Sequence, residues 1–173
     1  MEENGNKNRL KVQIQALRSG NRADILAALK EIRSTGRVSI LPELIDLLAD
    51  QDDELISSEI ISLLNDLKNQ EAASVLTGAI ANPAYKEISR ILVAACWQNG
   101  LSYRNYLDTF VEVALDGDYA TAIEAFTVIE EDVGGLEQQR RKELAGSIRS
   151  RLPETAEHKT PLLKELIKVI ENY

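Results

Sequence analysis

Apolar residues recur along most of the chain at the three- and four-residue spacing of an amphipathic α-helix. Ile25, Leu29 and Ile32 fall at positions i, i+4 and i+7, and Ile56 and Ile60 begin the same pattern further along. This spacing gathers the apolar side chains on one side of a helix, which must then be buried against another element. Alternating apolar and polar runs of the strand type are absent from the sequence. The pattern therefore predicts an all-α fold.

Glycine, proline, aspartate and asparagine interrupt this pattern at regular points. A glycine beyond a helix end supplies a left-handed C-cap, and Asp, Asn or Ser caps the start of the next helix. The interruptions predict ten helices, over residues 8–19, 21–35, 39–50, 53–68, 70–82, 84–99, 102–116, 118–133, 136–152 and 159–172. Residues 1–7 are mostly polar, and we expect them to form a disordered N-terminal tail ahead of a single domain over residues 8–173.

The predicted helices repeat in pairs. Ile25 and Ile56 are 31 residues apart, Ile56 and Ile88 are 32 apart, and Asp50 and Asn82 are also 32 apart. Each repeating unit is therefore expected to be two antiparallel helices joined by a short turn, and five such hairpins account for the predicted domain. A single hairpin cannot cover its own apolar stripe, so neighbouring hairpins stack and share a continuous core.

The second of these units resembles a HEAT repeat. The resemblance rests on the segment LPELIDLLADQD at residues 41–52, followed by Ile56 and the run IISLL at residues 60–64. HEAT repeats have a Leu-Pro-x-Leu-x-x-Leu-Leu pattern in the first helix and an Asp that closes the turn. The resemblance implies a right-handed α-solenoid of about five HEAT-like hairpins. The arginine that the family carries near the start of the second helix is replaced in the first three units by Leu26, Ser57 and Ser89.

Composition and charge narrow the function classes. The 173 residues are 44% hydrophobic but only 5% aromatic, which suits a core of closely packed aliphatic side chains. The net charge is −8, whereas proteins that bind nucleic acid or an anionic membrane are usually basic, so neither is expected as a partner. The N-terminus lacks the apolar region of a signal peptide, and no apolar run approaches the ~20 residues of a membrane span. The single cysteine, Cys96, fits a reducing compartment, so we expect a cytoplasmic protein.

No pattern in the sequence indicates catalysis. The only histidine, His158, cannot form a multi-histidine metal site, and Cys96 lies in an apolar stretch, where a cysteine usually behaves as a small hydrophobic residue. The acidic turn at residues 50–54 lacks the glycine and glutamate positions of a calcium-binding loop and suits the capping of a helix. We therefore predict no enzyme activity, no cofactor and no metal site.

The aromatic residues are clustered, and two interpretations of the cluster stay open. Seven of them fall within 42 residues: Tyr85, Trp97, Tyr103, Tyr106, Phe110, Tyr119 and Phe126. They could form a binding surface, because aromatic side chains are enriched at interaction hot spots, or they could fill the core beside small alanines. We expect Trp97 and Phe126 to be buried and Tyr103, Tyr106 and Tyr119 to form part of a surface.

The function predicted from these features is non-enzymatic: a protein-interaction or scaffold module. In HEAT-like stacks the second helices line the concave face, and we expect a partner protein segment to bind there along units two to four. The candidate partner-binding residues are Ser58, Ser62, Asn65, Lys86, Arg90, Tyr103, Tyr106, Tyr119, Glu124 and Glu130. Residues 38–135 carry a net charge of −14, and the segments before and after them carry +4 and +2. A basic segment is therefore the preferred partner.

Other function classes remain as alternatives. The chain could be a stabilising subunit of a larger assembly or a homo-oligomer, and the sequence leaves the oligomeric state open. HEAT-like DNA glycosylases and bilin lyases resemble this architecture too. A glycosylase needs a basic groove and an acidic catalytic group, and a lyase needs a nucleophile, so the acidic centre and the apolar setting of Cys96 argue against both.

Overall fold

The computed structural model describes residues 2–35 and 37–173. Within these residues it contains ten α-helices, as predicted, and five short 3₁₀ turns. The α-helices are α1 (Glu2–Leu17), α2 (Arg22–Thr35), α3 (Leu41–Ala49), α4 (Glu54–Asn65), α5 (Ala72–Ile80), α6 (Ser89–Asn99), α7 (Leu107–Asp116), α8 (Tyr119–Val133), α9 (Gln138–Arg151) and α10 (Thr160–Asn172). The 3₁₀ turns are η1 (Val38–Ile40), η2 (Pro83–Ile88), η3 (Arg104–Tyr106), η4 (Leu152–Glu154) and η5 (Glu157–Lys159).

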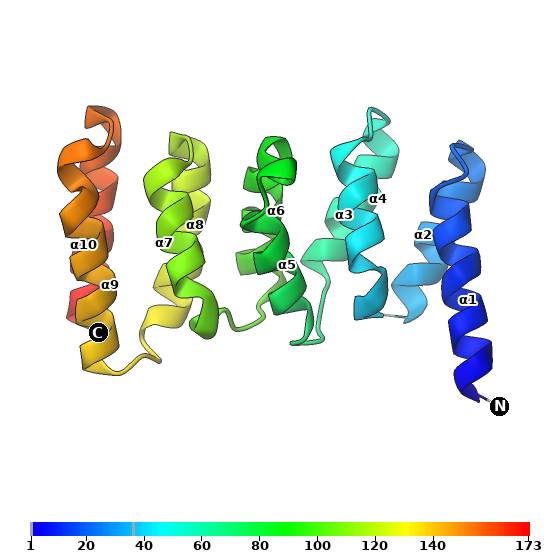
Figure 1. The fold of residues 1–173 in the computed structure, drawn as a ribbon, viewed down its shortest axis with the longest axis horizontal. Helices are drawn as coiled ribbons and strands as arrows, with labels where there is room; N and C mark the ends of the chain where they lie inside the picture. The colour runs from blue at the N-terminus through cyan, green and yellow to red at the C-terminus, as the bar shows by residue number, and fades with distance from the viewer. Residues whose placement is uncertain (1, 36) are drawn as a thin grey trace.

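Sequential helices pack as pairs, and the five pairs stand side by side in chain order, with the two termini at opposite ends of the row (Figure 1). Each even-numbered helix also packs against the even-numbered helix of the next pair, from α2 through to α10. Among the odd-numbered helices, α1 packs on α3, α3 on α5, and α7 on α9. The molecule therefore has two layers, which we call the even-helix layer and the odd-helix layer.

Short polar and glycine residues end and begin the helices where the sequence places them. The carboxylate of Asp53 accepts hydrogen bonds from the first backbone N–H groups of α4, and the Asp118 carboxylate accepts one from the backbone N–H of Thr121 in α8. Gly20 and Gly100 follow α1 and α6 with φ angles of 70° and 68°. Only glycine adopts this left-handed conformation without strain, so these two positions stop their helices. The capping interpretation of the acidic turn before α4 is confirmed.

A buried lysine caps the C-terminal end of α7. The side chain of Lys159 in η5 is only 4% exposed, and its ammonium group donates hydrogen bonds to the carbonyl oxygens of Ala114 at 3.1 Å, Gly117 at 2.8 Å and Leu115. The last carbonyls of a helix have no partner within the helix, so these bonds satisfy them. Burial lowers the pKa of Lys159 from its ordinary value. The contact ties the fifth pair to the fourth.

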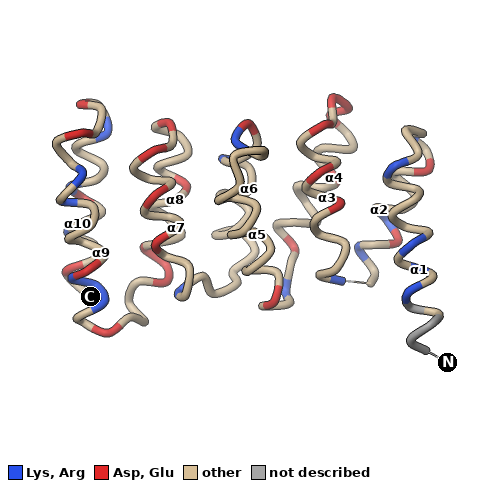
Figure 2. Tube along the Cα trace, in the orientation of Figure 1, with Lys and Arg blue, Asp and Glu red and all other residues tan. Residues whose placement is uncertain are grey.

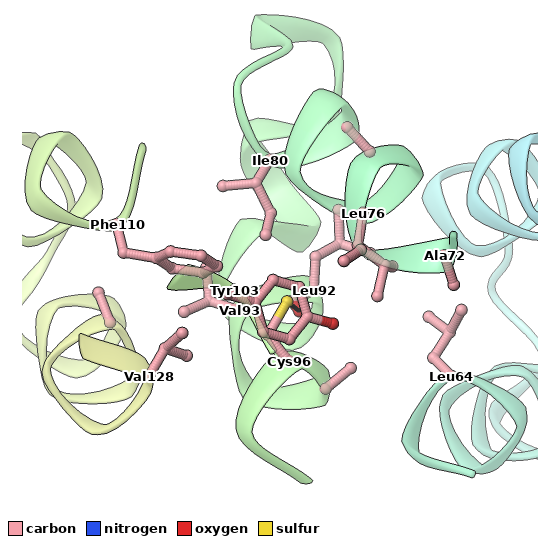
Figure 3. Packing of buried hydrophobic residues seen from close by; sticks show 14 of the residues in the cluster. Leu64, Ala72, Leu76, Ile80, Leu92, Val93, Cys96, Tyr103, Phe110 and Val128 are labelled. Carbon is pink, nitrogen blue, oxygen red and sulfur yellow. Dashed lines mark hydrogen bonds between the residues drawn. The ribbon is translucent and has the colours of Figure 1, made fainter. Parts of the chain in front are cut away.

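The core is aliphatic and runs along the whole row between the two layers. Leu64, Leu76, Leu92, Phe110 and Val128 come from five consecutive helices, α4 to α8, and all are almost fully buried (Figure 3). Neighbouring pairs therefore share one hydrophobic cluster, and no pair covers its apolar stripe alone.

Helices α1, α6 and α7 begin five or more residues away from their predicted starts, and α7 follows the 3₁₀ turn η3. Helix α1 begins at Glu2, so it includes residues that the sequence assigns to a tail, while Met1 lies outside the described residues. Residues 2–7 contain no apolar side chain, so the apolar periodicity on which the prediction depends gives no signal there. Before α6 lies η2, a 3₁₀ turn where the sequence predicts the start of an α-helix. The backbone of Tyr85 lies outside the helical region there, at φ −105° and ψ 20°.

Candidate interaction surface

Seven of the ten candidate partner-binding residues lie on even-numbered helices. Ser58, Ser62 and Asn65 belong to α4, Arg90 to α6, and Tyr119, Glu124 and Glu130 to α8. Ser58, Arg90, Tyr119 and Glu130 are exposed, and the other three are half-buried. The structure therefore places these residues on the solvent side of three neighbouring helices in one layer, which we call the even-helix surface. The remaining three candidates, Lys86, Tyr103 and Tyr106, lie outside α4, α6 and α8.

Tyr103 is buried, so the expectation that it forms part of a surface is wrong. Its side chain is 1% exposed and points into the centre of the core beside Cys96 (Figure 3). The ring meets Phe110 edge-on, with 5.5 Å between the ring centroids, and the hydroxyl accepts a hydrogen bond from the side-chain amide of Asn99 at 3.0 Å. Burial raises the pKa of Tyr103. The turn after Gly100 returns the chain to the core, which the local sequence pattern does not reveal.

Lys86 and Tyr106 take positions away from the even-helix surface. Tyr106 ends η3, and its half-buried side chain packs against the core. Lys86 lies in η2 and is exposed beside a groove between the end of α5 and α7. These two residues therefore lie in η2 and η3, outside the three helices that carry the other candidates.

Trp97 shows the opposite error, because the sequence predicts it to be buried and the structure exposes it. Its side chain is 36% exposed on α6, and its indole N–H donates a hydrogen bond to the Glu124 carboxylate of α8 at 2.8 Å. Cys96, one residue earlier, is fully buried. A step of one residue turns a helix by roughly 100°, which carries Trp97 out of the buried stripe. Phe126, also expected to be buried, is half-buried and packs against the core.

Exposed apolar side chains lie on all three helices of the even-helix surface. Large hydrophobic residues that are exposed within the described part of the chain include Leu55 on α4, Trp97 on α6, and Tyr119 and Ile123 on α8. Two others, Val12 and Tyr173, lie near the ends of the chain. Single exposed hydrophobic residues are ordinary, whereas a group on adjoining helices is typical of an interaction site. The sequence prediction missed Leu55 and Ile123. The sequence could have identified Ile123, because it lies one turn after Tyr119. This places it on the side of α8 opposite the buried alanines Ala122 and Ala125.

The charges on this surface are mainly unpaired carboxylates. Glu124 holds the indole of Trp97, and Glu130 and Glu131 lie near the C-terminal end of α8. In the described part of the chain none of these three forms an ion pair with a lysine or arginine. Burial and the neighbouring carboxylates raise the pKa of Glu131. Along the chain, basic positions recur on α1, and acidic ones recur on α7 and α8 (Figure 2).

Polar side-chain contacts join neighbouring pairs at similar separations along the chain. Arg22 pairs with Asp53 at 2.5 Å, and Arg33 pairs with Asp66 at 2.6 Å. In the next pair along, the Asn65 amide donates to Gln98 at 2.9 Å. These contacts join residues 31 to 33 positions apart. Neighbouring pairs are therefore tied by polar side chains as well as by the shared core.

Cys96 lies in the core and His158 on the surface. The Cys96 thiol is buried, as expected, and burial raises its pKa to about 12, which keeps it protonated and unreactive at neutral pH. His158 is exposed and lies near Tyr119, with 6.1 Å between the ring centroids. The described residues hold no group of three or more His, Cys, Asp or Glu side chains placed to bind a metal ion.

Two further findings bear on the class of protein. Among the helices of the described residues, none combines the length and apolar character that crossing a bilayer requires. No family model, curated protein or solved structure matches the chain, so comparison with known proteins assigns it neither a family nor a function.

Proposed function

We propose that the chain is a non-enzymatic protein-interaction module, built as a HEAT-like α-solenoid, that binds a basic segment of a partner protein on its even-helix surface. The observation that carries this proposal is the group of exposed apolar side chains on α4, α6 and α8, which lies beside carboxylates without basic partners. A surface of this kind combines area that gains from leaving water with charge that selects the partner.

The repeat architecture supports this proposal. Five sequential helical pairs stand in a row, and side-chain contacts between them join residues 31 to 33 positions apart. In stacks of this kind one layer of helices forms an extended surface across several repeats, which suits a partner segment better than a small ligand. The even-helix layer is such a surface, because every one of its helices packs directly on the next.

The chemistry of the surface indicates which side chains the partner would present. The hydrogen bond from Trp97 to Glu124 fixes the indole ring, so little rotamer entropy is lost when a partner covers it. Ile123 and Tyr119 extend the apolar area along α8. Glu130 and Glu131 supply negative charge near one end of the same helix, so lysine or arginine side chains beside an apolar residue would complement the surface.

A pull-down from the native cell with the intact chain as bait tests this surface. We expect the combined substitution Tyr119→Ser and Glu124→Gln to weaken recovery of the partner. Val12→Ser is the control, because Val12 is also an exposed apolar residue but lies on α1, outside the even-helix surface. Circular dichroism establishes that both variants are folded. Equal recovery by the double variant and the wild-type chain would contradict the surface assignment.

A further inference from the structure

A groove of about 590 Å³ opens between α7 and the segment that joins α5 to α6. This volume falls within the range of roughly 300–1,000 Å³ that is usual for ligand sites. The apolar side chains of Ile80, Pro83 and Val113 contribute to its lining. The lining comes mainly from α5, η2 and α7 and includes neither Trp97 nor Ile123, so the groove is separate from the even-helix surface.

The segment after α5 that borders the groove is not a continuous α-helix. Asn82 caps the turn, and Pro83 then starts η2 in place of a further turn of α-helix. Two of the residues that line the groove, Ala81 and Gly117, are small. They cannot fill the space that larger aliphatic side chains fill elsewhere between the pairs.

One wall of the groove carries a row of carboxylates. Asp108, Glu112 and Asp116 follow one another at four-residue spacing, which places them on one face of α7. Arginines of α9 pair with them: Arg140 with Asp108, and Arg151 with Glu112 at 2.6 Å and with Asp116. The three acidic side chains nevertheless remain between 59% and 63% exposed, so their oxygens stay accessible to a further cation.

The opposite side of the groove carries the reverse charge. Lys86 of η2 lines it and forms no ion pair within the described part of the chain. A basic ligand group would be repelled by Lys86 and attracted by the carboxylates of α7. The groove is therefore negatively charged on the α7 side and positively charged on the η2 side, in addition to having an apolar lining.

We propose that this groove binds a second protein segment, one in which an apolar side chain stands next to a lysine or arginine. The apolar side chain would contact Ile80, Pro83 and Val113, and the cationic group would share the carboxylates of α7 with the arginines of α9. Complementary charge selects this occupant, and Lys86 sets which way the cation points. This site goes beyond the proposed function, because it uses the other helical layer and does not require the even-helix surface to bind anything.

The opposite charges on the two sides of the groove give a test in which one substitution weakens binding and another strengthens it. The probe is a short peptide in which leucine alternates with arginine, titrated into the ¹⁵N-labelled intact chain. We expect the backbone amide signals of Thr109, Val113 and Gly117 to shift saturably. Glu112→Gln should weaken this binding about threefold and Lys86→Glu should strengthen it about threefold, which is typical for one exposed charge. Damage to the fold could weaken binding in both variants but could not strengthen it in one.

The same spectra keep this proposal separate from the proposed function. The indole N–H of the only tryptophan, Trp97, reports on the even-helix surface, whereas Val113 and Gly117 report on the groove. Shifts at Val113 and Gly117 with the two opposite changes in affinity support the groove. If these amide signals do not shift, or if neither substitution changes the affinity measured from them, the groove proposal is overturned, whatever the indole signal does. A shift of the indole alone would support the even-helix surface and overturn the groove.

Discussion

The third and fourth helical pairs meet differently in the two layers of the molecule. In the even-helix layer, α6 packs directly on α8, and Trp97 and Glu124 join the two helices by a hydrogen bond. In the odd-helix layer, the space between the end of α5 and α7 forms a groove lined by Pro83 and Val113. The same two pairs are therefore closely packed on one side and open on the other.

This difference shows which residues hold the pairs together. Tyr103 and Phe110 fill the space between the layers, and Asn99 and Asp132 bond the hydroxyl and the backbone N–H of Tyr103. On the groove side, Ile80 belongs to the hydrophobic core and Val113 is only partly buried against it. We therefore expect substitutions in the cluster to cost stability and substitutions in the groove to be tolerated, so that the groove remains free to serve binding.

The largest expected effect is that of Phe110→Ala. The Phe110 side chain is fully buried against Tyr103, so its removal should lower the free energy of unfolding by about 3–5 kcal/mol. Val113→Ala, which removes a half-buried side chain from the groove, should cost less than about 1.5 kcal/mol. Urea denaturation followed by circular dichroism measures both. Equal losses of unfolding free energy in the two variants would contradict the distinction between the packed side and the open side.

Asn99→Ala should have the next largest effect. The Asn99 amide donates to the Tyr103 hydroxyl at 3.0 Å, and its removal leaves that buried hydroxyl unpaired, at a cost of about 1–3 kcal/mol. Adding Tyr103→Phe to this variant removes the unpaired group, so the double variant should lose less than the sum of the two single losses. Urea titrations of the three variants measure this coupling. Strictly additive losses would show that the pair does not act as a unit.

Gly117→Ala sharpens the comparison at the edge of the groove. A Cβ atom at position 117 would lie 2.6 Å from the backbone carbonyl oxygen of Val113, so the end of α7 must shift, which we expect to cost about 1–3 kcal/mol. Gly146→Ala is the matched control, since a Cβ there meets no atom within 4 Å and the substitution within α9 should stabilise by about 0.5–1 kcal/mol. Thermal unfolding compares the two. A Gly117→Ala variant as stable as the wild type would contradict the close approach.

The smallest expected effect is a change in the pH dependence of stability at the start of α8. The backbone N–H of Thr121 bonds the Asp118 carboxylate and lowers its pKa below the ordinary value of 3.8. The carboxyl group is a stronger acid in the folded chain than in the unfolded chain. Its contribution to stability is therefore fully present above pH 3.8 and is lost as the pH falls through the pKa of the folded state. Asp118→Asn keeps an oxygen that accepts the bond and removes this dependence. Denaturation midpoints at neutral pH and below pH 3.8 should therefore differ less in the variant, and equal acid sensitivity would contradict this assignment.

Much of the fold could be predicted because local patterns determine it. The 3.6-residue periodicity and the breaks between segments predict ten helices in sequential pairs, and Asp53, Asp118 and Gly100 end or begin helices as their chemistry requires. The contact of Lys159 with the end of α7 could not be predicted in this way. It joins residues 42 to 45 positions apart, and only the packing of the pairs brings them together.

The candidate site was less accessible to sequence reasoning, because exposure depends on small rotations and on neighbouring pairs. Trp97 lies one residue beyond the buried Cys96, and this single step decides that its ring faces solvent. Tyr103 stands in a loop, yet Asn99 gives its hydroxyl a buried partner. Lys86 lies in η2 ahead of α6 and lines a groove whose other wall is α7. Each of these placements is a property of the assembled pairs.

The fluorescence of Trp97 gives the most direct test of the central claim, that the even-helix surface binds a basic protein segment. Trp97 is the only tryptophan and lies on that surface, so its emission reports on the site without a label. A short amphipathic peptide rich in lysine and leucine should shift the emission to shorter wavelength in a saturable manner, and Glu124→Gln together with Glu130→Gln should weaken the binding. An unchanged emission at every peptide concentration, or an equal response to a peptide with glutamate in place of lysine, would contradict the claim.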